Sequence, residues 1–274
     1  MAYRKPFKFK LTKKQKEKAL VFSVTALCAC AIFWMFARPV GPLKSVAQRF
    51  TRHPKIVFVI DDIGNHDRYK EPLQALGDHV TYAILPLLPY SRYFSELGQK
   101  TGAEVILHLP LDTVQDKIPG RGLIVSTMSR ADILDMLDRD LASVPHHVGV
   151  NNHMGSRGTA DREMMTVILT ELKRRKLFFL DSYTTKDSTV AEVGRAVGLP
   201  ILTRGVFLDN LNTKAAVREE VRKLKALARE KGNAIGIGHY RKNTLEVLKD
   251  EIPKLEKEGF QVISLQDLLR FQRD

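Results

Sequence analysis

The stretch Ile56-Val-Phe-Val-Ile60 is an uninterrupted apolar run that two acidic residues, Asp61 and Asp62, follow directly. Apolar runs of this length, rich in β-branched and aromatic residues, are typical of strands buried on both faces, as in a parallel sheet. The pattern recurs five times, with a polar residue at or shortly after the end of each run: His108 after residues 104–107, His153 after 147–150, Asp181 after 177–180, Asp209 after 205–208 and His239 after 234–238. The sequence therefore predicts a parallel α/β fold.

Amphipathic stretches separate these apolar runs. Residues 129–144 begin with Ser129, a favourable N-cap residue, and place the side chains of Ile133, Leu137 and Leu141 on one face. Similar patterns predict helices over 69–76, 91–101, 161–175, 213–231 and 243–259, and further strands over 80–85 and 260–264. Seven or eight strand–helix units within residues 55–274 predict a distorted (β/α) barrel. A doubly wound open sheet is the alternative, because periodicity does not decide closure.

The N-terminal region has a different character. Residues 1–18 carry a net charge of +7 of the chain's total of +13, and residues 19–37 then contain no charged side chain. As a helix this apolar segment would be about 28 Å long, close to the thickness of the hydrocarbon core of a bilayer. We therefore expect a basic cytoplasmic tail over 1–18, one transmembrane helix over 19–37, a linker over 38–54 and the folded domain over 55–274.

The positive charge before the apolar segment predicts the location of the domain. By the positive-inside rule the N-terminus lies in the cytoplasm, so a single-pass anchor in a bacterial inner membrane would hold the domain in the periplasm or outside the cell. Both cysteines, Cys28 and Cys30, lie in the apolar segment, so the domain is expected to fold without disulfides. Cleavage or lipidation of this segment is the alternative to a permanent anchor.

The remaining positive charge is spread over the domain without a basic stripe, which argues against a nucleic-acid partner. The sequence predicts no particular oligomeric state.

Asp61 and Asp62 are the sharpest local signal for chemistry. Adjacent carboxylates at the end of a buried strand repel one another unless a cation or a proton intervenes. A divalent metal bound by one of them would leave the other as a general base for a bound water. The structural alternative is a turn that caps the next helix, with Gly64 after it.

Histidines follow two of the other buried runs. Two imidazoles and one carboxylate, with an open fourth position for water, form a common catalytic zinc arrangement. His108 and His153 are therefore predicted metal ligands, and hydrogen-bonded structural histidines are the alternative. His239, in the small-residue segment 236–239, is a candidate general acid for a leaving amine or alkoxide.

Four further polar residues lie at or next to the ends of the predicted strands and are therefore candidates for the same site. Asn151 and Asn152 offer amide groups beside His153, suitable for binding a polar substrate or supporting a metal ligand. Asp181 and Asp209 could each orient a histidine or bind a sugar hydroxyl. For both aspartates, a structural role in capping a loop is the alternative.

Six blocks of sequence in one order resemble the divergent polysaccharide deacetylases, a distant branch of the NodB-like carbohydrate esterases. They are VIDDIG at 59–64, EVILHLPLD at 104–112, GVNNHMGS at 149–156, FFLDSYTT at 178–185, RGVFLDN at 204–210 and AIGIGH at 234–239. The resemblance runs from Lys55 to the C-terminus. It implies a distorted barrel of seven or eight units and a divalent metal, with zinc expected. By similarity, Asp61 would be the base, Asp62 a metal ligand and His239 the acid.

The chain also departs from the NodB-like pattern. Those enzymes usually take both metal histidines from one HxxxH-type motif, which is missing here, so His108 and His153 from different strands would replace it. The customary arginine and tryptophan motifs are not evident, and Tyr183 and Gly205 stand where Arg and Asp are expected in this branch.

Together these features predict a membrane-anchored, metal-dependent hydrolase that removes acetyl groups from an envelope or secreted polysaccharide by means of a metal-activated water. One alternative is a non-catalytic envelope protein that binds glycan or a protein partner on the same fold. Another is metal-dependent hydrolysis of a different ester or amide bond.

Overall fold

The computed structural model describes residues 12–13, 53–115 and 117–273. The chain separates into two units, Met1–Thr51 and Arg52–Asp274, and all the elements below belong to the second. The predicted transmembrane helix lies outside the described residues, as do the predicted tail apart from residues 12–13 and the linker apart from residues 53–54. Among the helices that are described, none is long and apolar enough to cross a membrane.

The centre of the domain is a curled sheet of parallel strands, and the predicted parallel α/β fold is confirmed. The order across the sheet is β6-β5-β4-β3-β2-β1-β8-β7, and a short β9 pairs with the start of β1. The strands are β1 (Lys55–Ile63), β2 (Thr81–Ile84), β3 (Val105–Leu111), β4 (Gly149–Met154), β5 (Phe178–Asp181), β6 (Ile201–Thr203), β7 (Val206–Phe207), β8 (Asn233–His239) and β9 (Gln261–Val262).

The two ends of this strand order, β6 and β7, are consecutive in the chain. β6 pairs with β5 while β7 pairs with β8, and only Arg204 and Gly205 separate them. The amide of Arg204 donates to the carbonyl of Asp181, and the amide of Gly205 donates to the carbonyl of Ile235. The curl is therefore a half-barrel that the chain bridges at a seam, rather than a barrel closed by a further strand ladder between the described residues.

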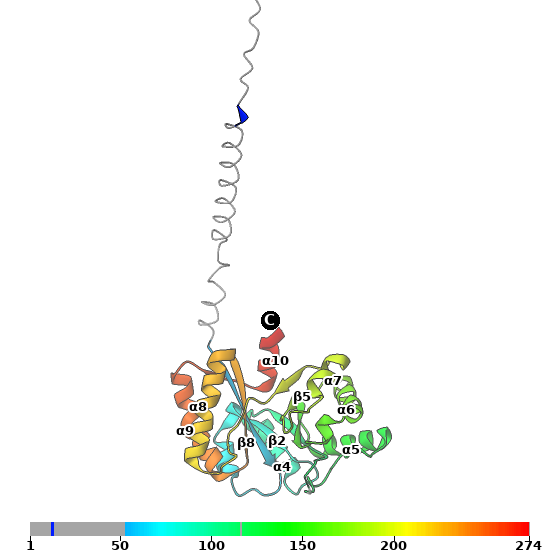
Figure 1. Cartoon of the computed structure of the whole chain (residues 1–274). Coiled ribbons are helices and arrows are strands. Elements are labelled where there is room, and N and C mark those ends of the chain that lie inside the picture. The colour runs from blue at the N-terminus through cyan, green and yellow to red at the C-terminus, as the bar shows by residue number, and fades with distance from the viewer. Residues whose placement is uncertain (1–11, 14–52, 116, 274) are drawn as a thin grey trace, which may run out of the picture. The chain divides into compact units, whose positions relative to one another are not determined.

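Helices follow most strands and pack on the outside of the curl (Figure 1). Figure 1 shows α8 and α9 on one side of the sheet and α5, α6 and α7 on the other. The helices are α3 (Lys70–Gln74), α4 (Ser91–Thr101), α5 (Arg130–Ser143), α6 (Arg162–Arg174), α7 (Val190–Val197), α8 (Lys214–Lys231), α9 (Lys242–Lys257) and α10 (Leu265–Arg273), with short 3-10 turns at Gly77–His79 and Gly158–Ala160. Side-chain N-caps begin four of them, at Ser129, Asp161, Thr213 and Ser264.

Two apolar cores explain why the strand sequences are continuous apolar runs. Successive strand side chains point to opposite faces. In β1, Phe58 and Ile60 belong to the outer core beneath the helices, while Val57 and Val59 belong to a second core inside the curl. Both faces are therefore buried, as the apolar run predicts.

Helix α10 covers one end of the inner core. Leu265 and Leu268 pack against the inward-facing strand residues. The carboxylate of Glu104, just before β3, accepts hydrogen bonds from the amides of Leu265 and Gln266, so a half-buried acid anchors the start of this helix. Because β9 and α10 lie at the amino ends of the strands, the opposite end is left for the polar residues.

Candidate metal centre and active site

Strand alternation decides which polar side chains reach the interior at the carboxyl ends of the strands. Asp61 continues the inward positions of β1, and the register pairs it with His239 of β8. In the pair formed by β3 and β4, His108 is opposite Asn151, and His153 follows Asn151 by two residues on the same face. The fold thus brings these five residues, distant in sequence, to one end of the curl.

Asp62 has the wrong alternation for this interior, and a local irregularity re-aims it. The register between β1 and β2 shifts between Ile60 and Ile63, and Asp62 adopts a left-handed conformation with φ of 64°. As a result, the neighbouring carboxylates lie in different surroundings. Asp61 is 2% exposed, whereas the side chain of Asp62 is 35% exposed.

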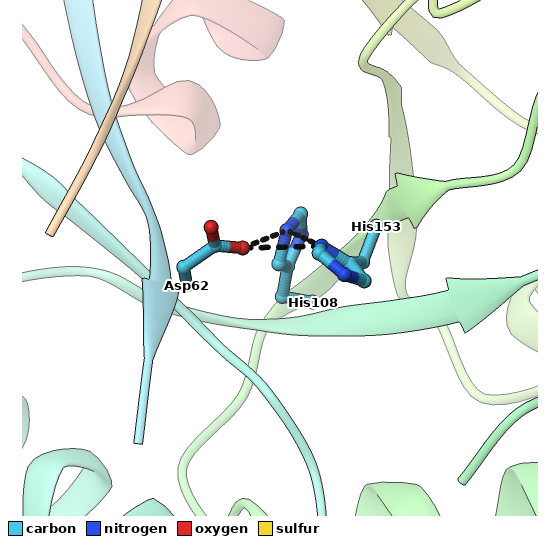
Figure 2. A group of neighbouring side chains, drawn as sticks. All are labelled: Asp62, His108 and His153. Atoms are coloured by element: carbon cyan, nitrogen blue, oxygen red, sulfur yellow. Dashed lines mark hydrogen bonds and ion pairs between the residues drawn. The ribbon is translucent and has the colours of Figure 1, made fainter. Parts of the chain in front are cut away.

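One oxygen and two ring nitrogens form a tight triangle (Figure 2). Oδ1 of Asp62 lies 3.1 Å from Nδ1 of His153 and 3.3 Å from Nε2 of His108, and the two nitrogens are 3.1 Å apart. This carboxylate oxygen is buried, yet it accepts no well-directed hydrogen bond from the described residues. Three atoms that can each donate a lone pair to a metal therefore face one another, and no single hydrogen-bond donor among the described residues is placed to bond all three.

The dimensions of the triangle fit a bound zinc-like cation. Ligands arranged tetrahedrally at about 2.0–2.1 Å from a zinc ion lie roughly 3.3–3.4 Å from one another. The observed separations of 3.1–3.3 Å are close to this value. The donor set of two imidazoles and one carboxylate is also a common catalytic zinc set, which leaves a fourth position open. Asp62, His108 and His153 are thus placed to hold a divalent metal.

Asn151 supports both a ligand of the triangle and the neighbouring acid. Its Oδ1 is 2.8 Å from Nδ1 of His108, so His108 donates from Nδ1 and directs the lone pair of Nε2 into the triangle. Its Nδ2 donates to Oδ1 of Asp61 at 2.9 Å and to Oγ of Ser182 at 3.2 Å. A single buried amide therefore fixes the tautomer of His108 and the orientation of Asp61.

The two aspartates have pKa shifts of opposite sign. Burial raises the pKa of Asp61, and the charges of His108 and His239 offset only part of this effect. Burial also acts to raise the pKa of Asp62, but close contacts with His108 and His153 outweigh it and hold that pKa well below its usual value. Such a pair suits one base that exchanges a proton and one permanently ionised ligand.

His239 is oriented by Asp209. Oδ1 of Asp209 accepts from Nδ1 of His239 at 2.7 Å, and its Oδ2 accepts from the amide of His239 and from Oγ of Thr244. Burial by itself lowers the pKa of His239, but the bond to Asp209 and the negative charges of Asp62, Asp209 and Asp61 together outweigh burial, and the pKa is raised. The opposite nitrogen, Nε2, is left to act as a proton donor.

The two remaining predicted residues bond elsewhere, and strand alternation gives the reason. Asp181 follows the inward Leu180 and so points the other way; it accepts from the amide of Tyr183 and from Oγ of Ser188. Asn152 follows the inward Asn151, donates to the carbonyl of Met154 and accepts from the amide of Ser182. These contacts favour the structural alternative for Asp181, and they give Asn152 a loop-holding role that was not among the predictions.

An open cleft gives access to the triangle. Its volume is about 350 Å³, and its lining includes Asp62, His153, His239, Tyr240 and Arg241. Tyr240 and Arg241 were not predicted, although they directly follow His239. Arg241 donates to the carbonyl of Asp209 and so helps to hold the loop that orients His239.

Comparisons with known proteins identify the family of this chain. Residues 58–269 match the family described as divergent polysaccharide deacetylase. An uncharacterized protein of Haemophilus influenzae is 34% identical over 220 residues, which are 80% of this chain and 78% of that protein.

Solved structures share the fold at low sequence identity. An uncharacterized protein of Agrobacterium tumefaciens superposes with a TM-score of 0.75 at 20% identity, over 79% of this chain and 89% of that one. The catalytic domain of a peptidoglycan N-acetylglucosamine deacetylase from Eubacterium rectale superposes with a TM-score of 0.51 at 14% identity, over 78% and 89%. The match over residues 58–269 shows that the chain belongs to the divergent polysaccharide deacetylase family.

Proposed function

We propose that this protein is a membrane-anchored, zinc-dependent hydrolase that removes acetyl groups from an envelope or secreted polysaccharide. The observation that carries the proposal is the triangle of Asp62, His108 and His153, with a buried carboxylate, Asp61, and an oriented imidazole, His239, beside it. This set contains the ligands, the base and the acid that hydrolysis of an acetyl group needs.

A zinc ion held by the triangle would polarise the acetyl carbonyl and lower the pKa of a water molecule. Asp61 takes a proton from the attacking water. Its raised pKa makes it a stronger base than an exposed aspartate, while the amide of Asn151 keeps its carboxylate in place.

His239 acts on the leaving group. Its raised pKa favours the protonated form of the imidazole, and Nε2 donates the proton to the departing amine or alkoxide. Asp209 accepts from Nδ1 throughout and stabilises the imidazolium form. Transfer of this proton, together with attack by water at the carbonyl, releases acetate.

The family and the open cleft support a polysaccharide substrate. Polar side chains, among them Asp62, His153 and His239, line the cleft, and its volume of about 350 Å³ is sufficient for part of an acetylated sugar. The proposed location, in a bacterial inner membrane with the domain in the periplasm or outside the cell, depends on residues 1–37 of the sequence.

One feature favours a second candidate, a non-catalytic protein that binds glycan or a protein partner through the same cleft. His108 and His153 come from separate strands instead of one short motif, so the metal set is built differently from that of NodB-like enzymes. A protein can keep the fold and the metal without turnover.

Acetate release separates the two candidates. The wild-type chain should hold one equivalent of zinc by elemental analysis and release acetate from acetylated chitooligosaccharides or peptidoglycan fragments. Asp61→Asn should keep the zinc and lose acetate release, whereas His108→Ala should lose both. A zinc-loaded wild type that binds these glycans without releasing acetate, with binding unchanged in Asp61→Asn, would instead establish the binding function.

A further inference from the structure

The seam between β6 and β7 lies next to the proposed acid and carries a side chain with no assigned role. At this point the sheet lacks a ladder between its two ends among the described residues, and the chain crosses it through Arg204 and Gly205. Gly205 is constrained there, because a Cβ at this position would meet Leu227 at 2.7 Å and the carbonyl oxygen of Ile235 at 3.2 Å. The backbone of the seam is therefore tightly packed on the β8 side.

The side chain of Arg204 reaches to the β5 side of the seam. Its Nε donates to the carbonyl of Ser182 at 2.7 Å, and its Nη2 donates to the carbonyl of Tyr183 at 2.9 Å. Tyr183 has a left-handed backbone with φ of 50°, which a non-glycine residue adopts only when its surroundings impose it. One edge of the guanidinium thus holds the loop that follows β5.

The face of the same guanidinium packs on the β7 side. The central carbon of Arg204 lies 3.8 Å from the centroid of the Phe207 ring. Phe207 in turn stacks on the imidazole of His239, with ring centroids 6.1 Å apart and planes inclined by 17°. Guanidinium, phenyl ring and imidazole therefore form a continuous stack that ends on the proposed acid.

Through Ser182, Arg204 is also connected to the proposed base, Asp61. Ser182 accepts from Nδ2 of Asn151, and the same nitrogen donates to Asp61. Arg204 consequently joins two hydrogen-bond networks, one around Asp61 and one around His239, across the point where the sheet has no strand ladder.

We propose that Arg204 is a positioning residue: it packs on Phe207, which stacks on His239, and so holds the imidazole in the orientation that hydrogen-bonds Asp209. This inference builds on the proposed function, in which His239 is the acid. Arginine suits the role because its planar group can donate from its edge and stack with its face at once, which a lysine ammonium cannot do.

The test follows the tautomer of His239 in the full-length protein, in detergent micelles, by ring ¹⁵N chemical shifts. The chain has eight histidines, and His239→Gln assigns the signal. In the wild type, at a pH where the imidazole is neutral, the proton should stay on Nδ1 because Asp209 accepts it. Arg204→Lys and Phe207→Leu both conserve charge, and each should raise the population of the Nε2-protonated tautomer by roughly fivefold or more.

The double variant and a control at another arginine make the test specific. Because Arg204 acts through Phe207, Arg204→Lys combined with Phe207→Leu should shift the tautomer no further than Phe207→Leu alone. Arg157→Lys changes an arginine whose ion pair is with Asp112, and it should leave the tautomer unchanged. Zinc content and thermal unfolding confirm that each variant is folded.

Additive effects in the double variant, or a tautomer unchanged by Arg204→Lys in a folded protein, would overturn the inference. Acetate release is measured separately: its absence in the wild type would refute the proposed deacetylase activity without touching the tautomer result. Conversely, activity in a wild type whose tautomer is insensitive to Arg204 would refute only the positioning role.

Discussion

Replacement of Asn151 by alanine is the perturbation that tests the site most directly. The change removes the partner of Nδ1 of His108 and the partner of Oδ1 of Asp61, at 2.8 and 2.9 Å. Asp61 and His108 are each 2% exposed, so water does not readily replace the lost amide. Each lost hydrogen bond costs about 1 kcal/mol between neutral groups and about 1.5–3 kcal/mol where one group is charged.

The expected effect on the metal follows from the tautomer of His108. Without Asn151, Nδ1 loses its acceptor, so the lone pair of Nε2 is no longer fixed towards Asp62 and His153. Loss of a group that supports a metal ligand typically lowers metal affinity about 10- to 100-fold. We therefore expect Asn151→Ala to weaken zinc binding within that range, measured by competition with a chromophoric chelator.

The neighbouring Asn152 provides the matched control. It is the same residue type and is 1% exposed, but it bonds the carbonyl of Met154 and the amide of Ser182 and contacts neither His108 nor Asp61. Asn152→Ala should destabilise the fold by about 1–3 kcal/mol in urea unfolding and leave zinc affinity within about threefold. Equal losses of zinc affinity in both variants, or none in Asn151→Ala, would refute the assigned role of Asn151.

Three further predictions address pH, metal and packing. Activity should need Asp61 ionised and His239 protonated, so kcat/KM should decrease at pH values below the raised pKa of Asp61 and at pH values above the raised pKa of His239. Because the bond to Asp209 is the largest contribution that raises the pKa of His239, Asp209→Asn should move the alkaline limb of the pH–rate profile to lower pH. Removal of zinc with EDTA should lower Tm by about 5–10 °C, as expected for loss of a ligand at about 100 times its Kd in a domain of this size, and circular dichroism should still show a folded domain because both apolar cores lie outside the triangle. Leu268→Ala, in the helix that covers the inner core, should cost about 2–5 kcal/mol in urea unfolding and leave zinc affinity unchanged; a change in zinc affinity would mean that the two ends of the curl are coupled.

Much of the fold could be predicted because buried parallel strands leave an unambiguous apolar signature. The helix predicted over 91–101 matches α4, and that over 129–144 differs from α5 by one residue at each end. Strand β6, helix α7 and helix α10 were not predicted. β6 has three residues bounded by Pro200 and Arg204, too few for periodicity to show. α10 begins directly after the strand predicted over 260–264, and its N-cap residue, Ser264, was assigned to that strand.

For the candidate site, the sequence predicted which residues lie at the ends of strands, but not which atoms they contact. The position of a polar residue after a strand places it at the correct end of the sheet, which was enough to group Asp62, His108 and His153. It does not assign partners, and for Asp181 and Asn152 the partner lies in a loop. Ser182 and Arg204 lie in two of the blocks that resemble the family, but the pattern assigned them no role, because polar residues in irregular segments have no periodicity and their contacts exist only once β5, β7 and β8 are assembled.

The pairing of β3 with β4 gives a physical reason why the absence of an HxxxH motif need not prevent metal binding. On two neighbouring parallel strands, a residue and the one two positions beyond its partner share a face and lie close on the diagonal. His108 is paired with Asn151, and His153 is two residues further on, so the register brings two histidines of different strands together without such a motif. The intervening partner, Asn151, is thereby placed between the two ligands on the same face, where it bonds His108 and Asp61 at once. The same spacing that replaces the motif therefore also puts the supporting amide in position.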